Sequence, residues 1–278
     1  MLGAPTYMVM PHTAQIVYTA IWAAIMLAFA VYGAILLLRR RDPLLLVLLL
    51  GGAIAYFNEP IDDLLGLCWH PRPGQWVAIR TFGPAPLWGV FVYMALFGGI
   101  AYLMASAFER GVTRRQVWTW IGLFWIADLA VEIPAIASGM YKYYGHPPMQ
   151  VAGLPLYWFA INIGGPVLTA LAVLLTRRRL TGWWRVLLLL PVPMVLDAAC
   201  SVAMGWPIFS ALHAQSSMPV KYLAAFVTLA MGVTLMEVTI RFVSSRAPAS
   251  EPARSGELEA PVVDSTRLAF AGAQSAKS

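Results

Sequence analysis

PLLLVLLLGGAIAYFNEPIDDLLGLCWHP, residues 43–71, is the stretch that decides the fold of this chain. Its first half carries no charge, and the whole is long enough for the ~20 residues with which a helix crosses a bilayer. The helix then ends on three acids, Glu59, Asp62 and Asp63. An ionised carboxylate within a bilayer is costly, so these acids must either reach water or line a functional cavity.

The composition is that of an integral membrane protein. Of the 278 residues, 60% are hydrophobic and 12% are charged, whereas soluble domains carry roughly 25% charged residues. The net charge of +6 does not indicate nucleic-acid binding, because the arginines stand in short clusters beside apolar segments. Cys68 and Cys200 are too few for a disulfide framework, although a single bridge between them can form.

The hydropathy pattern predicts an all-α fold, a polytopic membrane bundle of seven transmembrane helices within residues 1–245. The predicted spans are about 14–38, 44–66, 85–107, 116–138, 155–176, 183–205 and 219–243. Residues 246–278 are small, polar and proline-containing, which is typical of a disordered tail. The prolines and aromatics of the 67–84 loop predict an ordered cap or a re-entrant loop.

Basic residues alternate between the loops. The loops after the first, third, fifth and seventh spans hold most of them: Arg39, Arg40, Arg41, Arg110, Arg114, Arg115, Arg177, Arg178, Arg179, Arg185, Arg241 and Arg246. The other loops hold only Arg72, Arg80, Lys142 and Lys221. The positive-inside rule therefore predicts an N-terminus outside the cell and a cytoplasmic C-terminus.

Four predicted spans carry acids or amides at a similar depth. They are Glu59, Asp62 and Asp63 on the second span, Asp128 and Glu132 on the fourth, Asn162 on the fifth and Asp197 on the sixth. Residues three or four apart share a helix face, so we expect these side chains to meet in the outer half of the bilayer. Glu237 lies near the cytoplasmic end of the seventh span, where Arg241 can pair with it at i+4.

These acids have a structural and a catalytic interpretation. A structural acid pairs with a basic residue, but the second, fourth, fifth and sixth spans have no Lys or Arg at matching depth. We therefore expect some of the carboxyls to hold a proton and to act as general acids. Asp62 and Asp63 fit a position at the water line equally well, whereas Asp128 and Asp197 are the hardest to explain structurally.

Aromatic side chains follow on the same outer side. Tyr141, Tyr143, Tyr144, Tyr157 and Trp158 surround the start of the fifth span. They fit an interfacial aromatic belt, or a lid of aromatic walls that shields a cation and excludes water. His70 and His146 are expected to be loop residues rather than ligands.

Several membrane-protein classes are excluded by what the sequence lacks. A retinal protein needs a lysine deep in its last helix. The lysines here are Lys142, Lys221 and Lys277, and only Lys221 falls in the last span, at its outer end. Four scattered histidines cannot form a di-iron site. The chain has no second Asp-rich diphosphate motif beside DDLLG, and no P-loop, GxSxG or GxGxxG. Acid chemistry without a metal or nucleotide cofactor, or transport, remains.

Four segments together resemble the AveC-type spirocyclase family of actinobacterial membrane proteins. They are PTYM (5–8), YFNEPIDDLLGLCWHP (56–71), DLAVEIPAIASGMYKYYG (128–145) and LPLYWFAIN (154–162), and the likeness runs over roughly residues 5–245. The resemblance implies a protein of the bacterial cell membrane that closes a dihydroxy-ketone into a spiroketal and can dehydrate it. It carries over no catalytic residue.

Two weaker likenesses imply related chemistry. The chain is similar to small integral membrane terpene cyclases, in which Glu59 and Asp197 would be the counterparts by helix position. YKYYGHPPMQVAGLPLYWF (141–159) is faintly similar to the carotenoid hydratase and lycopene cyclase group. All three resemblances imply a buried acid, a lipophilic substrate and a cationic intermediate.

We therefore predict a membrane-embedded, acid-catalysed cyclase of a lipophilic polyketide or terpenoid. Asp128 and Asp197 are the expected acid and base, with Glu59 and Glu132 as electrostatic partners. Expected substrate contacts are Asp62, Asp63, Asn162, Tyr141, Tyr144 and Trp158. The alternatives are a proton-coupled transporter, in which the same acids relay protons, and a non-catalytic scaffold.

Overall fold

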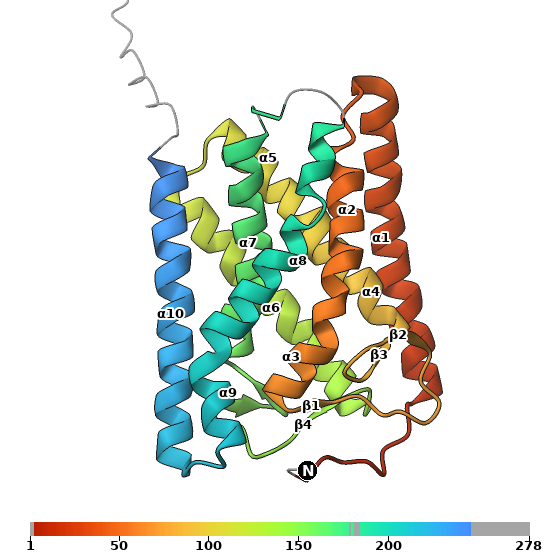
Figure 1. The fold of residues 1–278 in the computed structure, drawn as a ribbon, viewed down its shortest axis with the longest axis vertical. Coiled ribbons are helices and arrows are strands. Elements are labelled where there is room, and N and C mark those ends of the chain that lie inside the picture. The colour runs from red at the N-terminus through yellow and green to blue at the C-terminus, as the bar shows by residue number, and fades with distance from the viewer. Residues whose placement is uncertain (1–2, 178, 181–183, 246–278) are drawn as a thin grey trace, which may run out of the picture. The chain divides into compact units, whose positions relative to one another are not determined.

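The computed structural model describes residues 3–177, 179–180 and 184–245 as a helix bundle (Figure 1). The predicted tail, residues 246–278, lies outside the described residues. The α-helices are α1 His12–Arg40, α2 Leu44–Ala55, α3 Glu59–Gly66, α4 Leu87–Tyr93, α5 Ala101–Arg110, α6 Arg114–Ala137, α7 Trp158–Thr176, α8 Val192–Ala198, α9 Gly205–His213 and α10 Met218–Ser244.

Shorter elements link these helices. The 3-10 segments are η1 Tyr56–Asn58 and η3 Arg185–Leu189, and the π-helical segments are η2 Met94–Ile100 and η4 Ala199–Met204. The strands are β1 Cys68–Trp69, β2 Val77–Arg80, β3 Pro84–Pro86, β4 Lys142–Tyr143, β5 Gln150–Val151 and β6 Leu154–Pro155.

Within the described residues, seven helical segments are long and apolar enough to cross a membrane. They are His12–Arg40, Leu44–Gly66, Leu87–Arg110, Arg114–Ala137, Trp158–Thr176, Arg185–His213 and Met218–Ser244. The all-α prediction and the number of apolar helices are confirmed. Successive segments run in opposite directions, so that α10 ends at the opposite end of the bundle from the N-terminus (Figure 1).

The sixth segment is longer than predicted. The span was predicted to end near residue 205, yet the helix continues through Pro207 to His213. The π-helical segment η4 directly precedes Gly205. Pro207 lies in the first turn of α9, the part of a helix in which a missing N–H is tolerated best.

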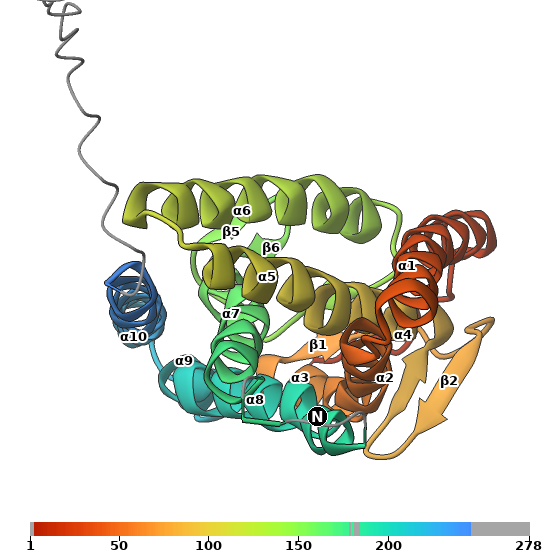
Figure 2. The same ribbon diagram turned by 90° about the horizontal axis from the view of Figure 1, so that it is seen from above.

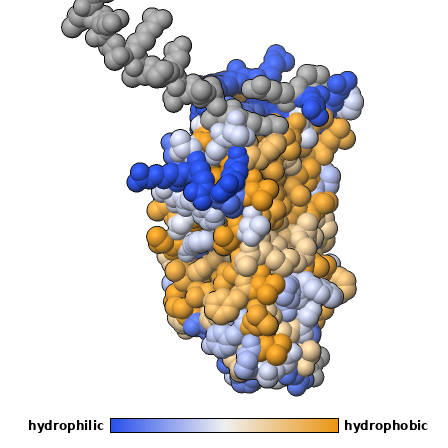
Figure 3. Space-filling view, turned by 90° about the vertical axis from the view of Figure 1, so that its left-hand side faces the viewer, coloured by the Kyte–Doolittle hydropathy of each residue, from blue (hydrophilic) through white to orange (hydrophobic). Residues whose placement is uncertain are grey.

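The bundle has a buried centre and exposed flanks. Seen along the helices, α1, α6 and α10 lie at the edge of the bundle, while α7 lies inside it (Figure 2). Over their most apolar windows α1 and α6 are each only 11% buried, compared with 56% for α7. Apolar side chains cover the middle of the surface, and hydrophilic ones gather towards the end at which α10 finishes (Figure 3). The exposed belt includes Leu123 and Ile126 of α6 and Leu223 of α10.

Two adjacent glycines let α2 approach its neighbours closely. A Cβ atom on Gly52 would lie 2.6 Å from the carbonyl oxygen of Tyr93, and one on Gly51 would lie 2.7 Å from that of Leu190. Both are below any ordinary contact distance for such a carbon. Small residues at helix contacts are typical of membrane bundles, in which close packing replaces the hydrophobic effect.

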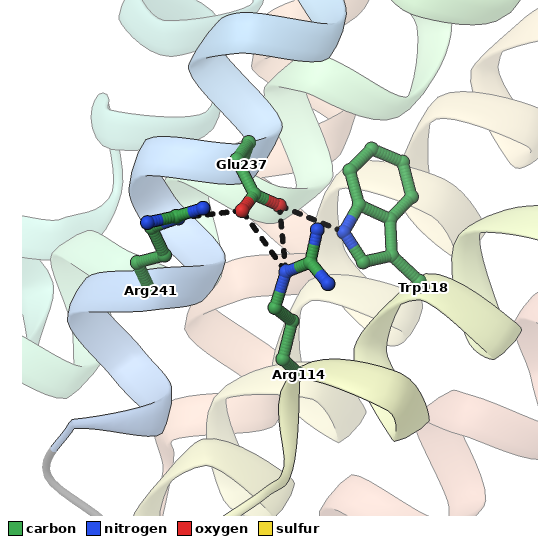
Figure 4. A network of polar contacts seen from close by, with 4 residues as sticks. All are labelled: Arg114, Trp118, Glu237 and Arg241. Carbon is green, nitrogen blue, oxygen red and sulfur yellow. Dashed lines mark hydrogen bonds and ion pairs between the residues drawn. The ribbon is translucent and has the colours of Figure 1, made fainter.

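Ion pairs join the helices near the arginine-rich end. The carboxylate of Glu237 accepts hydrogen bonds from Arg241 Nε at 2.6 Å, Arg114 Nε at 2.9 Å and Trp118 Nε1 at 2.9 Å (Figure 4). The predicted i+4 pair is therefore confirmed, and the two further donors join α10 to α6. Arg177, which follows α7, pairs with Glu109 of α5 and with Asp42 in the loop between α1 and α2.

The opposite end is covered by ordered loops, as predicted for residues 67–84. Strands β2 and β3 form a hairpin, and β1 pairs with β4 so that Cys68 lies opposite Tyr143. The loops after the second and fourth spans are thereby joined. Both cysteines are free, so the single bridge that the sequence allowed does not form.

Candidate functional site

The predicted acids line one cavity. It measures about 350 Å³ and lies between α1, α3, α4, η2, α6, α7 and α8, beneath the β1–β4 loops. Six carboxyls reach it: Glu59, Asp62, Asp63, Asp128, Glu132 and Asp197. Among the described residues that line this cavity, none is a lysine or arginine. The remaining wall is mainly aromatic and aliphatic.

Asp197 is held by an amide from a neighbouring helix. Asn58 donates one hydrogen bond to Asp197 Oδ2 at 2.8 Å and another to the backbone oxygen of Met194 at 2.9 Å. Asn58 and Asp197 are both buried, at 4% and 6% exposure. Because the amide is fixed to the α8 backbone, it holds the carboxyl in one orientation. A group so oriented can present its second oxygen to a ligand.

Glu59 follows Asn58 in the sequence and pairs with a different partner. The hydroxyl of Tyr93, at the end of α4, donates to Glu59 Oε2 at 2.8 Å. Tyr93 directly precedes the π-helical segment η2, and η2 contributes Phe97 and Ile100 to the cavity wall. π-helical turns occur often at functional sites, and the second one, η4, adds Ser201 to the same wall.

The two acids of α6 face the cavity one turn apart, as predicted. Asn162 of α7 donates to Asp128 Oδ2 at 3.3 Å, and the Tyr141 hydroxyl donates to Glu132 Oε2 at 2.5 Å. Asp128 therefore has one long hydrogen bond, whereas Glu132 has a short one. Asp128 is the less restrained of the two.

Asp62 and Asp63 point into different surroundings. Asp62 is 7% exposed, and in the described part of the chain its buried Oδ1 has no hydrogen-bond partner. The indole N–H groups of Trp88 and Trp158 are also buried and unpartnered there, and both residues line the cavity. A buried polar atom without a partner costs free energy, so these three groups are available to hydrogen-bond a ligand.

Asp63 contacts a histidine that the sequence did not single out. His70 Nδ1 lies 3.0 Å from Asp63 Oδ2, and the imidazole packs near the rings of Trp88 and Tyr141. Burial by itself would lower the pKa of His70, but the Asp63 carboxylate and the acids around it outweigh burial and raise the pKa. His70 is thus the group on the cavity wall that is best able to carry a positive charge.

Other groups in the cap resist ionisation. Burial, together with the Glu132 carboxylate, raises the pKa of Tyr141 well above its ordinary value. Burial and the nearby Asp63 carboxylate likewise raise the pKa of the Cys68 thiol. Tyr141 therefore remains a hydrogen-bond donor, and the free thiol of Cys68 is poorly suited to act as a nucleophile.

The predicted site residues separate into two groups. Those that line the cavity are Glu59, Asp62, Asp63, Asp128, Glu132, Tyr141, Trp158, Asn162 and Asp197. Tyr144 is not part of the lining; it lies in the cap, where its backbone N–H bonds to Leu67. The sequence did not point to Asn58, Tyr93 or His70. Asn58 and His70 lie close to Glu59 and Asp63 in the chain, and Tyr93 lies in the next predicted span. Position was therefore the only signal that could have found them.

A second, apolar pocket lies beside the first. It measures about 490 Å³ and shares Ile100, Phe124 and Ala127 with the carboxyl-lined cavity. It runs between α5 and α6 as far as Arg110. An acidic pocket and an apolar pocket thus lie side by side.

Comparison with family models, with characterised proteins and with solved structures finds no match to this chain.

Proposed function

We propose that the chain is an integral membrane protein of the bacterial cell membrane, with its N-terminus outside and its C-terminus in the cytoplasm. The seven apolar segments and the belt of exposed apolar side chains support membrane insertion. The orientation is supported by arginines at the ends of α1, α5 and α10, because basic residues remain on the cytoplasmic side. The acidic cavity then lies in the outer half of the membrane.

In this proposal the protein is a cofactor-independent cyclase of a lipophilic small molecule. The observation that carries it is the convergence of six carboxyls in one largely apolar cavity without a lysine or arginine in its described lining. Carboxyls that cannot pair with cations are expected to share protons, so that some donate while others accept. This combination suits acid-catalysed formation and quenching of a carbocation or oxocarbenium ion.

Spiroketal formation would need one carboxyl that donates a proton and one carboxylate that accepts a proton. A protonated carboxyl transfers its proton to the hydroxyl of a hemiketal, the C–O bond breaks, and water leaves an oxocarbenium ion. The second substrate hydroxyl then attacks that carbon, and a carboxylate takes the proton released. The net change is loss of one water, and the acid and base exchange roles.

Asp128 and Asp197 take the roles of acid and base in this proposal. Asp128 has only one long hydrogen bond, to Asn162, and Asp197 is oriented by Asn58. Glu59 and Glu132, each bonded to a tyrosine hydroxyl, are placed to stabilise positive charge on the substrate. Aromatic rings such as Trp88 shield a cation from water and interact with it through their faces.

The apolar second cavity supports a lipophilic substrate. Its walls, including Leu103, Leu123 and Ile163, can bind the chain of a polyketide or terpenoid while the reacting end lies among the acids. The resemblance to AveC-type spirocyclases favours a dihydroxy-ketone, and the weaker likeness to membrane terpene cyclases favours an alkene or epoxide. Both substrates would require the same proton transfers.

The test is untargeted mass spectrometry of lipid extracts from a producing strain. Wild type is compared with a gene deletion, and with the deletion complemented by Asp128→Asn, by Asp197→Asn or, as a matched control, by Asp42→Asn at the arginine-rich end. We expect the deletion strain to accumulate a precursor. It should lack the compound that wild type makes from it, which is either an isomer of the precursor or the precursor less one water. The two cavity variants should match the deletion, and the control should match wild type.

A carrier would give a different result. If the extracts agree in composition and only the distribution of a compound between cells and medium changes, the protein transports its ligand. The walls of the second cavity weigh against a proton relay, because Arg110 is their only titratable group among the described residues. If the two cavity variants restore every compound, a scaffold that merely binds lipid replaces both enzyme and carrier.

A further inference from the structure

Three different ligand types meet at the capped end of the acidic cavity. The carboxylate of Asp63, the thiol of Cys68 and the imidazole of His70 place their ligand atoms within 4.8 Å of one another. The closest pair is Asp63 Oδ2 and His70 Nδ1, at 3.0 Å. All three residues line the cavity, and none takes part in the proton transfers proposed above.

A reversal of the backbone after α3 brings these three side chains together. Helix α3 ends at Leu67, which adopts a left-handed conformation with φ 53° and donates its N–H to the carbonyl oxygen of Asp63. A left-handed conformation costs about 1–2 kcal/mol for a residue other than glycine. The reversal folds Cys68 and His70 back over Asp63, and the pairing of β1 with β4 fixes Cys68 opposite Tyr143. Many helices end on a residue in this conformation, and here it sets the direction of the chain after α3.

The spacing fits a zinc ion. With Zn–N, Zn–O and Zn–S bonds of about 2.0–2.3 Å, ligand atoms around a tetrahedral ion lie about 3.3–3.7 Å apart. The Asp63–His70 pair is already slightly closer than that, and no pair exceeds 4.8 Å. Movements on the order of 1 Å, within reach of side-chain rotation, would bring all three atoms onto one ion.

The surroundings favour a cation as well. Five further carboxyls share the cavity, and the described lining holds no lysine or arginine to neutralise them. The site is shielded: the side chain of His70 is only 4% exposed and that of Asp63 is 17% exposed. A thiol and an imidazole select zinc over magnesium or calcium, which prefer oxygen ligands only.

We infer that Asp63, Cys68 and His70 form a zinc site with its fourth position open towards the cavity. Three protein ligands and one open position are the pattern of catalytic zinc, whereas structural zinc has four protein ligands. An ion here would bind an oxygen of a ligand in the cavity, and the proton transfers between carboxyls proposed above would not require it. The site does not depend on the proposed cyclase activity, since a carrier or a lipid-binding protein with these residues would also bind the ion.

The test uses the full-length protein in detergent, stripped with a chelator and then dialysed against zinc. Metal content is measured by mass spectrometry, and cobalt is added as a coloured substitute, because thiolate–cobalt bonds absorb in the near ultraviolet. We expect about one zinc per chain and the thiolate–cobalt band. Cys68→Ser should abolish the band, and both Cys68→Ser and Asp63→Asn should weaken zinc binding at least tenfold.

Cys200→Ser is the matched control, because Cys200 is buried on another helix and should leave both readouts unchanged. Circular dichroism and size-exclusion profiles establish that each variant is folded. If Cys68→Ser does not fold, blocking the thiol of stripped wild-type protein before adding metal provides the same comparison. A wild-type protein that takes up no zinc, or a Cys68→Ser variant that binds as wild type does, overturns the inference. Neither result bears on the lipid-extract test.

Discussion

Replacing Gly52 by alanine should destabilise the bundle, although alanine is the better helix former. The new Cβ would lie 2.6 Å from the Tyr93 carbonyl oxygen and 2.8 Å from the Met94 Cα. Ordinary contact begins at 3.4 Å, so the overlap with Tyr93 is about 0.8 Å. Both obstructing atoms belong to the backbone, so no side-chain rotation relieves them and the segments must move apart.

The magnitude follows from two opposing effects. Overpacking a tight contact costs about 1–3 kcal/mol, while exchanging glycine for alanine in a helix gains about 0.8–1.0 kcal/mol. Gly122 in α6 is the matched control, because nothing lies within 4 Å of a Cβ built there. Gly122→Ala should therefore gain the helix-propensity term alone. The two variants should differ by about 1–3 kcal/mol in the free energy of unfolding.

The assay is unfolding in mixed micelles, followed by circular dichroism as SDS is titrated. We expect Gly52→Ala to unfold at a lower SDS fraction than wild type, and Gly122→Ala at an equal or higher one. Since Tyr93 also donates to Glu59, the displaced segment should lower product formation in the strain. Equal unfolding free energies for the two variants would refute the claim that backbone contact at Gly52 fixes the spacing.

Three further predictions concern polar contacts between helices. Asn58→Leu removes the donor to Asp197 at nearly constant side-chain volume. The amount of product in lipid extracts should fall as it does in Asp197→Asn, while the protein remains folded. Product at the wild-type level would exclude a positioning role for Asn58. Glu237→Gln should lower the thermal stability of the solubilised protein without altering product, and an unchanged transition would show that its arginine pairs contribute nothing. Tyr18→Phe removes the 2.7 Å bond to the Val131 oxygen, worth about 0.5–1.5 kcal/mol. Hydrogen exchange in α6 should then quicken, and an unchanged rate would mean that this bond does not hold α1 to α6.

Much of the scaffold is readable from the sequence, because the bilayer imposes simple rules. Apolar stretches of a fixed length predicted seven helices, and the structure has seven such segments in its described part. Helical spacing predicted that Asp128 and Glu132 share a face, and both line the cavity. The pairing of Glu237 with Arg241 followed from the same i,i+4 rule and is present.

What the sequence did not reveal depends on contacts between segments far apart in the chain. Asn58 is one uncharged amide in an apolar run, and its role is visible only where α8 brings Asp197 beside it. His70 looked like a loop residue because the left-handed position that returns it to Asp63 is Leu67 and not the adjacent Gly66, so the usual glycine signal does not fall on it. The hydropathy of a segment also does not show whether its backbone hydrogen bonds span four or five residues, so neither π-helical segment was predicted.

Those π-helical segments have an evolutionary consequence. A π turn holds one residue more than the α-helical turn that it replaces, so gaining or losing a single codon can create or remove it. Each residue of an α-helix turns its direction by about 100°. A one-residue deletion in a regular α-helix rotates everything after it, whereas a deletion within Ala199–Met204 would turn the π turn into an α turn, leave Pro207 in place and change which side chains of this segment, such as Ser201, face the cavity. A lineage could in this way exchange one wall of the acidic cavity for another, and so adapt to a new ligand, while keeping all seven helices.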